Sequence, residues 1–152
     1  MSNIQRTAIM PYSASQMYNL VCDINSYKDF LPWCADSKIL KETKNKNAKN
    51  NAPEHIVEAK LWVKKGLIET DFTTRNTLTE NISLKMELLD GPFEFLDGHW
   101  EFIALNENAC KIELKLSYRF ANTAFSIALK PIFTQIGNKM LDAFCTRAKE
   151  VY

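Results

Sequence analysis

Histidine and acidic side chains are the groups most able to do acid–base chemistry, and in this sequence they are scattered. The only histidines, His55 and His99, fall on different predicted strands, and no acid or nucleophile stands at a spacing that marks a catalytic dyad. Asp90 and Asp97 flank a predicted turn, a common position for aspartate. We therefore expect no catalytic residues.

The cysteines are also far apart in the sequence. They are Cys22, Cys34, Cys110 and Cys145. Without the close paired spacing of a zinc site or a thioredoxin motif, they predict no metal site. We interpret them as small buried apolar residues that stay reduced in a cytoplasm. A signal peptide is not expected, because Gln5 and Arg6 interrupt the N-terminal stretch, and no apolar run approaches the ~20 residues that cross a bilayer.

One stretch is locally basic. It contains Lys38, Lys41, Lys44, Lys46 and Lys49, with Glu42 as the only acid among them. The run could contact ribosomal RNA or anionic lipid head groups. A solvated hairpin loop over residues 44–53 is the commoner explanation of a charge run, and the aromatic residues that stack on bases are missing from it. Because the net charge is only +1, DNA is not an expected partner.

Large apolar side chains offer a different chemistry, the binding of an apolar ligand. They recur on one face of the predicted strands and of the C-terminal helix, where they could surround a concave site. The candidate lining residues are Phe72, Met86, Leu88, Phe93, Trp100, Phe102, Leu116, Tyr118, Phe133, Ile136 and Met140. The alternative is that these residues only fill core volume.

A short aromatic segment lies between the predicted short helices and the second strand. Its residues Phe30, Leu31 and Trp33 could form a gate to the site. Exposed aromatics there would also suit transient contact with a membrane surface. The alternative is a buried hydrophobic corner that fixes the path of the chain into the sheet.

The elements that must position these residues follow from hydrophobic periodicity. Alternation with a period of two predicts strands over residues 3–10, 37–41, 54–64, 67–78, 82–88, 93–105 and 110–120. Because short connections join the later six strands, they predict an antiparallel meander. A bulge is expected at Asp97–Gly98, since glycine tolerates the bulge conformation.

Helical periodicity appears in three places. Ser13 and Gln16 have the spacing of a capping box at the start of a first helix, and residues 23–30 predict a second short one. Residues 122–151 predict a long amphipathic helix. Its apolar face comprises Phe125, Leu129, Phe133, Ile136, Met140 and Phe144. Pro131 predicts a kink or a break, with the main helix beginning there.

This order of elements predicts one α+β domain over residues 1–152. A chain of 152 residues is the usual size of a single core. The apolar face of the sheet needs a cover, and only the C-terminal helix is long enough to provide it. Twisted strands around one helix curve into a cup. Whether the inward side chains meet or leave a cavity is not fixed by the pattern.

Several separated strings resemble those of one family. They are Pro11–Ala14 with Gln16–Tyr18, Phe30–Cys34, Phe72–Asn76, Asp90–Phe93, and Ala143–Phe144 with Arg147–Tyr152. In this order they are similar to the coenzyme Q-binding START-like family, whose bacterial members include the ribosome association toxin and proteins labelled oligoketide cyclase or lipid transport protein. The resemblance covers essentially the whole chain, and the lysine- and asparagine-rich loop is its main departure.

The resemblance implies a helix-grip (START/Bet v 1-like) fold and more than one function. The first hypothesis is non-enzymatic binding of a hydrophobic molecule, ubiquinone or another isoprenoid or lipid, that supports respiration or lipid transport; no cofactor is required, although ubiquinone could be bound. The alternative is a toxin that binds a ribosomal subunit and blocks subunit association. A third is a polyketide cyclase or dehydratase. The expected location is the cytoplasm, at times peripheral to the inner face of the membrane.

Overall fold

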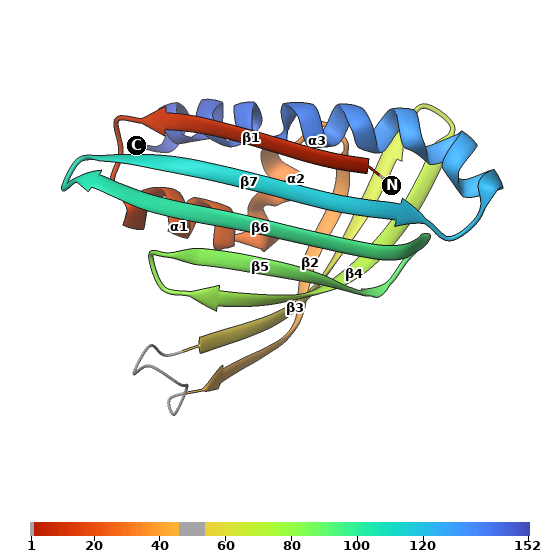
Figure 1. Ribbon diagram of the computed structural model, residues 1–152, viewed down its shortest axis with the longest axis horizontal. Helices are drawn as coiled ribbons and strands as arrows, with labels where there is room; N and C mark the ends of the chain where they lie inside the picture. Colours follow the sequence, from red (N-terminus) through yellow and green to blue (C-terminus); the bar gives the residue numbers. More distant parts are fainter. Residues whose placement is uncertain (1, 46–53) are drawn as a thin grey trace.

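A curved antiparallel sheet and a long helix dominate the computed structural model, which describes residues 2–45 and 54–152 (Figure 1). The elements in chain order are β1 (Ser2–Met10), α1 (Ala14–Cys22), the 3₁₀ turn η1 (Ile24–Ser26), α2 (Tyr27–Phe30), β2 (Cys34–Asn45), β3 (Glu54–Lys65), β4 (Ile68–Thr79), β5 (Ser83–Asp90), β6 (Phe93–Asn106), β7 (Ala109–Phe120) and α3 (Thr123–Val151). This confirms the predicted order and the α+β fold class.

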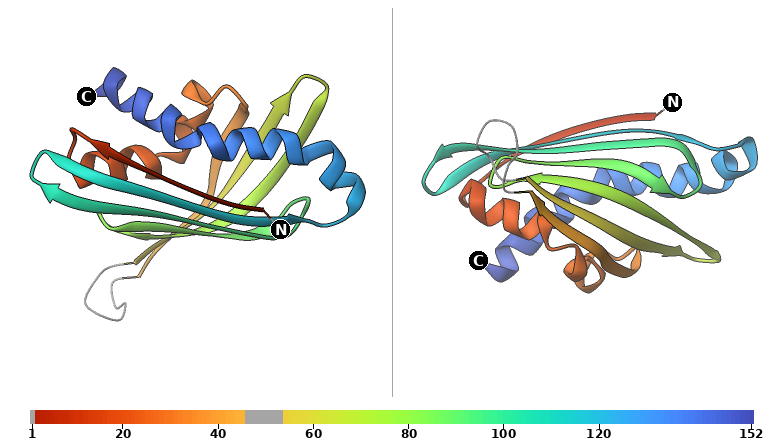
Figure 2. Two further views of the ribbon diagram at one scale, coloured as in Figure 1. Left: turned by 45° about the horizontal axis from the view of Figure 1, so that its top comes forward. Right: turned by 90° about the horizontal axis from the view of Figure 1, so that it is seen from below.

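The sheet contains seven strands in the order β1-β7-β6-β5-β4-β3-β2, and every neighbouring pair is antiparallel. Strands β2 to β7 form the predicted meander, and β1 returns to pair with β7 at the other edge. Because the strands twist, β2, β3 and β4 curl away from the plane of the others (Figure 2). The result is a concave face that can surround a helix.

The long helix α3 crosses this concave face (Figure 2). It approaches the sheet closely at Gly137, where a Cβ atom would lie 2.2 Å from Cδ1 of Ile4 on β1. The break predicted at Pro131 is wrong, because α3 runs unbroken from Thr123 to Val151 with Pro131 inside it. Its N-terminal turns diverge from the axis of the rest (Figure 2), as a missing amide hydrogen bond would allow. Phe125, placed on the apolar face by periodicity, is 42% exposed.

The start of α1 shows the predicted capping box. The Gln16 amide donates to Ser13 Oγ at 3.0 Å, and the Ser13 amide donates to Gln16 Oε1 at 2.9 Å. Two amides that the helix leaves without intrahelical partners are thereby satisfied. This fixes α1 directly after β1.

Strand β6 corrects one prediction. The register is continuous through Asp97 and Gly98 on both sides, so no bulge lies there. The irregularities fall nearer the strand ends, between Phe93 and Phe95 and after Ala104. Glycine at position 98 instead leaves room for two neighbouring side chains. A Cβ atom there would lie 3.1 Å from Leu116 Cδ2 and 3.1 Å from Met86 Cε.

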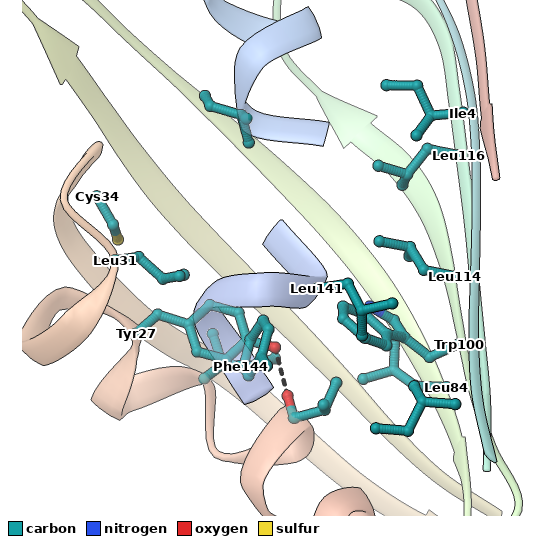
Figure 3. Packing of buried hydrophobic residues seen from close by; sticks show 14 of the residues in the cluster. Ile4, Tyr27, Leu31, Cys34, Leu84, Trp100, Leu114, Leu116, Leu141 and Phe144 are labelled. Atoms are coloured by element: carbon teal, nitrogen blue, oxygen red, sulfur yellow. Dashed lines mark hydrogen bonds between the residues drawn. The ribbon is translucent and has the colours of Figure 1, made fainter. Parts of the chain in front are cut away.

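The core contains two groups of aromatic rings. Phe144 on α3 stands between Tyr27 and Trp100, with ring centroids 5.2 Å from each (Figure 3). The second group surrounds Phe133, also on α3, and comprises Phe72, Phe93, Tyr118 and Phe120. Edge-to-face contacts predominate in both groups, as the quadrupoles of aromatic rings favour. The helix is therefore clamped to the sheet at two places.

Candidate functional site

An inner cavity lies between α3 and the concave face of the sheet. Its volume is about 60 Å³, room for on the order of four water molecules. The lining residues are Tyr27, Trp33, Leu61, Phe72, Met86, Leu96, Trp100, Leu116, Tyr118, Phe133, Ile136, Gly137 and Met140. Members of both aromatic groups are among them. The inward side chains therefore fill most of the cup and leave a small apolar space.

Most of the predicted lining residues meet in this cavity. They are Phe72, Met86, Trp100, Leu116, Tyr118, Phe133, Ile136 and Met140. The other three lie elsewhere. Phe102 packs edge-to-face on Tyr18 of α1 with centroids 5.8 Å apart, Phe93 belongs to the second aromatic group, and Leu88 is a half-buried residue packed against the core.

Sequence reasoning did not select four lining residues, namely Tyr27, Leu61, Leu96 and Gly137. For two of these four residues, the sequence pattern does indicate an inward position. Leu61 continues the inward alternation of Val57 and Ala59, and Gly137 follows Phe133 by one helical turn. Tyr27 had none, because a single turn of helix is too short for periodicity to fix which side faces inward.

An outer groove adjoins the inner cavity. Its volume is about 360 Å³, and its lining residues are Pro32, Trp33, Lys64, Lys65, Gln135, Ile136, Lys139 and Ala143. Trp33 and Ile136 line both spaces. The groove is therefore an apolar trough with lysines in its wall and with the inner cavity behind it.

The three predicted gate residues have different positions. Leu31 is 2% exposed and belongs to the core, as the alternative of a buried corner requires. Phe30 is half-buried, its ring centroid is 5.2 Å from that of Phe144, and the Arg147 guanidinium carbon lies 5.2 Å from the Phe30 centroid. Of the three predicted gate residues, only Trp33 lines both the cavity and the groove. If a gate operates here, Trp33 is the side chain placed to form it.

Few polar groups reach the inner part of the cup. Asn76 is 2% exposed, and its amide donates to the Val57 carbonyl and to Thr74 Oγ1, both at 3.1 Å. Both side chains line a smaller space of about 30 Å³ beside the cavity. Tyr27 donates its hydroxyl hydrogen to the Val21 carbonyl, whereas the buried Tyr118 hydroxyl has no partner among the described residues.

Neither histidine lines the cavity or the groove. His99 pairs across the sheet with Lys85 and Lys115 on the convex face. His55 Nε2 lies 3.4 Å from Glu42 Oε2, without the geometry of a hydrogen bond. Among the described residues, no group of three or more potential metal ligands is gathered. The cavity thus has apolar walls suited to holding a molecule.

The basic run is divided between the two faces of the sheet. Lys38 pairs with Lys60 and Lys41 pairs with Glu58, which places both on the convex face. Lys44 pairs with His55 on the opposite face. Lys46 and Lys49 lie outside the described residues, as does most of the predicted loop. Where the structure describes the run, its lysines do not share one surface.

The cysteines are free thiols. Burial raises the pKa of Cys34 to about 11 and that of Cys22 to about 12. Both thiols are therefore protonated near neutral pH, and a protonated thiol is a poor nucleophile. This agrees with their interpretation as small core residues.

The family described as "Polyketide cyclase / dehydrase and lipid transport" matches residues 10–145. The chain belongs to this family. Within the described residues, no helix is both long and apolar enough to cross a membrane.

Two relatives of this chain have names that point to different functions. The ribosome association toxin RatA of Pseudomonas aeruginosa is 44% identical over 99% of this chain and 98% of its own length. The mitochondrial coenzyme Q-binding protein COQ10 of Dictyostelium discoideum is 29% identical over 97% of this chain and 69% of its own. Neither is named as an enzyme.

Solved structures of other proteins share the architecture. A START superfamily protein from Mycobacterium smegmatis has a TM-score of 0.77 at 16% identity, with 99% of each chain covered. An aromatase/cyclase from Streptomyces has the same TM-score and identity, with 97% of this chain and 93% of its own covered. These similarities confirm the START-like helix-grip fold and, at such low identity, concern the fold alone.

Proposed function

We propose that this protein holds one hydrophobic molecule, without transforming it, in the outer groove and the inner cavity. The observation that carries the proposal is that Trp33 and Ile136 line both spaces. A groove of about 360 Å³ is within the range of ~300–1,000 Å³ that is typical of small-molecule sites. The inner cavity alone is too small, so the ligand occupies both.

An isoprenoid quinone such as ubiquinone is the ligand class we favour. A long apolar chain matches an elongated trough that continues into an apolar cavity. The name of the COQ10 relative supports the same class. Another lipid with a long chain would fit these walls on the same grounds, so the experiment must allow any apolar ligand to be found.

The walls also support a holding function over catalysis. The inner cavity is lined by aliphatic and aromatic residues, and its lining includes no histidine or carboxylate among the residues that the structure describes. General acid–base chemistry is most often carried out by such groups within hydrogen-bond reach of the substrate. Cyclase activity is the competing enzymatic hypothesis, because the family description includes it, and turnover of an aromatic polyketide would establish it.

The surface around the groove suits brief contact with a membrane, from which such a ligand would be taken. Leu67 in the β3–β4 hairpin is fully exposed, and Lys64 and Lys65 precede it in the same hairpin. Exposed apolar groups enter the interface, and lysines beside them attract anionic head groups. The location that we propose is the cytoplasm, at times peripheral to the inner face of the membrane.

Extraction of the protein from its own host tests the holding function. Organic extracts of the purified protein are analysed by mass spectrometry, and native mass spectrometry of the intact protein with added decylubiquinone measures occupancy. We expect one apolar molecule per chain. Recovery of none, together with no binding of added quinone, would exclude this function.

A second candidate function is binding to a ribosomal subunit with inhibition of subunit association. It is favoured by the toxin relative, whose identity of 44% over nearly the whole chain is higher than that of the quinone-binding relative. Sucrose-gradient sedimentation of ribosomal subunits with excess protein tests it. Loss of the 70S peak would support this candidate, and an unchanged peak would exclude it. Both functions could reside in one chain, because the ligand site is internal and a ribosome contact would be external.

A further inference from the structure

Tyr118 on β7 has a polar group that the fold leaves unused. The side chain lines the inner cavity, the residue is 2% exposed, and its buried hydroxyl has no hydrogen-bond partner among the described residues. Tyr27 provides the contrast. It is also buried, at 8% exposed, and lines the same cavity, yet its hydroxyl donates to the Val21 carbonyl (Figure 3).

A buried hydroxyl without a partner lowers stability, because it loses its hydrogen bonds to water and gains none in return. Phenylalanine would fill nearly the same volume without this cost. The presence of tyrosine at this position is therefore explained if the ligand supplies the hydrogen-bond partner of the hydroxyl. This argument depends on the holding function proposed above.

The chemistry of the wall restricts what that partner can be. Apart from Tyr118, the polar groups of the lining side chains are the Tyr27 hydroxyl, already bonded, and the indole N–H groups of Trp33 and Trp100, which are donors only. A ligand hydroxyl or amine would bring additional donors into this wall. A carboxylate would bring a charge, and none of the cavity's lining residues carries a positive charge.

We propose that the Tyr118 hydroxyl donates a hydrogen bond to a carbonyl oxygen of the ligand. The ligand is then a neutral ketone or quinone whose head group enters the inner cavity first. Its chain passes Trp33 and Ile136 and lies in the outer groove. Tyr118 thereby selects carbonyl compounds from other apolar molecules of similar length.

The test compares two ligands on the wild type and on two variants. Decylubiquinone has ring carbonyls, and decylbenzene has a similar chain without any. Isothermal titration gives the affinities. Tyr118→Phe is expected to weaken binding of decylubiquinone about five- to tenfold, the value of one neutral hydrogen bond. Its affinity for decylbenzene should not change, and its melting temperature without ligand should equal or exceed that of the wild type.

Tyr18→Phe is the control outside the site. Tyr18 is buried, packs on Phe102, and lines neither the cavity nor the groove. The affinity of this variant for both ligands should be that of the wild type. Infrared difference spectra add a readout that needs no variant, since a quinone carbonyl that accepts a hydrogen bond absorbs at lower wavenumber.

The outcomes separate this inference from the proposed function. If the wild type and Tyr118→Phe bind decylubiquinone equally well, the role of Tyr118 is overturned and the holding function stands. An unshifted carbonyl band in the bound quinone overturns it as well. If the wild type binds neither ligand, the holding function fails and the inference fails with it.

Discussion

Trp33 and Ile136 lie in the walls of both the inner cavity and the outer groove. Trp33 comes from the connection between α2 and β2, and Ile136 comes from α3. Trp33 is half-buried, whereas Ile136 is 6% exposed. A rotation of the Trp33 side chain would therefore widen the passage between the two spaces without any movement of the sheet or of α3.

Trp33→Ala is expected to accelerate ligand exchange several-fold, because the variant removes the indole ring from the wall of this passage. Stopped-flow measurement of decylubiquinone release would show the change. The loss of melting temperature should be small for a half-buried side chain. Leu31→Ala is the control in the same segment. Leu31 is 2% exposed, so its truncation should cost about 2–5 kcal/mol of unfolding free energy. Unchanged exchange rates in Trp33→Ala would remove this residue from the role of gate.

Met140→Ala is expected to weaken ligand binding more than it lowers stability, since Met140 lines the cavity and is only half-buried. Trp100→Ala should behave differently. Trp100 is 2% exposed and packs on Phe144 with centroids 5.2 Å apart, so its truncation should cost about 3–5 kcal/mol. Titration with decylubiquinone and thermal unfolding give the two quantities. If Met140→Ala loses as much free energy of unfolding as free energy of ligand binding, the residue only fills core volume.

Leu67→Ser is expected to reduce binding to vesicles that contain anionic lipid, at no cost in stability, because Leu67 is fully exposed. Co-sedimentation with vesicles measures the effect. Ile127→Ser is the matched control, since Ile127 is 75% exposed on α3 and is not part of the groove wall. An equal loss of vesicle binding in both variants would indicate nonspecific binding through exposed apolar residues and no specific contact at the groove.

The double substitution of Lys38 and Lys41 by serine is expected to weaken any binding to a ribosomal subunit, because both lysines are exposed on the same face of β2. Quinone binding should be unaffected, as neither residue lines the cavity or the groove. The control substitutes Lys85 and Lys115, also exposed on the convex face. Comparable sedimentation of both double variants with ribosomal subunits would argue against a contact through β2.

Alkylation of Cys34 by iodoacetamide is expected to be slow at pH 8.5 in the folded protein. Burial raises its pKa from 9.0 to about 11, and the thiolate is the reactive form. The rate should rise about tenfold per pH unit up to about pH 11, whereas an ordinary thiol levels off near pH 9. The pKa of Cys34 is higher in the folded protein than in the unfolded chain. The stability due to the buried thiol is therefore present below pH 9 and is lost as the pH rises through 11. Peptide mass spectrometry after timed alkylation measures the rate, and a plateau near pH 9 would contradict the expectation.

The strands were predictable because burial on one face imposes a period of two on the sequence. Val57, Ala59 and Val63 on β3 and Ile112, Leu114 and Leu116 on β7 are buried as their alternation predicts. The capping box at Ser13 was predictable for a similar reason, since its hydrogen bonds join residues three apart. Such local rules need no knowledge of the rest of the chain.

Where the pattern failed, a distant contact decided the outcome. Glycine at position 98 predicted a bulge, but it gives room to Met86 and Leu116 from the neighbouring strands. Pro131 predicted a break, yet Ile132 and Phe133 directly after it are buried against the sheet, and this packing keeps the helix unbroken. Lys38 and Lys44 are close in sequence, and a register shift on β2 helps to place them on opposite faces.

The sequence by itself determined the order of elements, the inward residues and the apolar character of the site. Only the tertiary structure decided that Phe102 packs under α1, that Trp33 lies where cavity and groove meet, and that the Tyr118 hydroxyl is left without a partner. The physical reason is that periodicity reports which side of an element is buried. The volume left between buried side chains, and the partner of each buried polar atom, depend on how separate elements pack against one another.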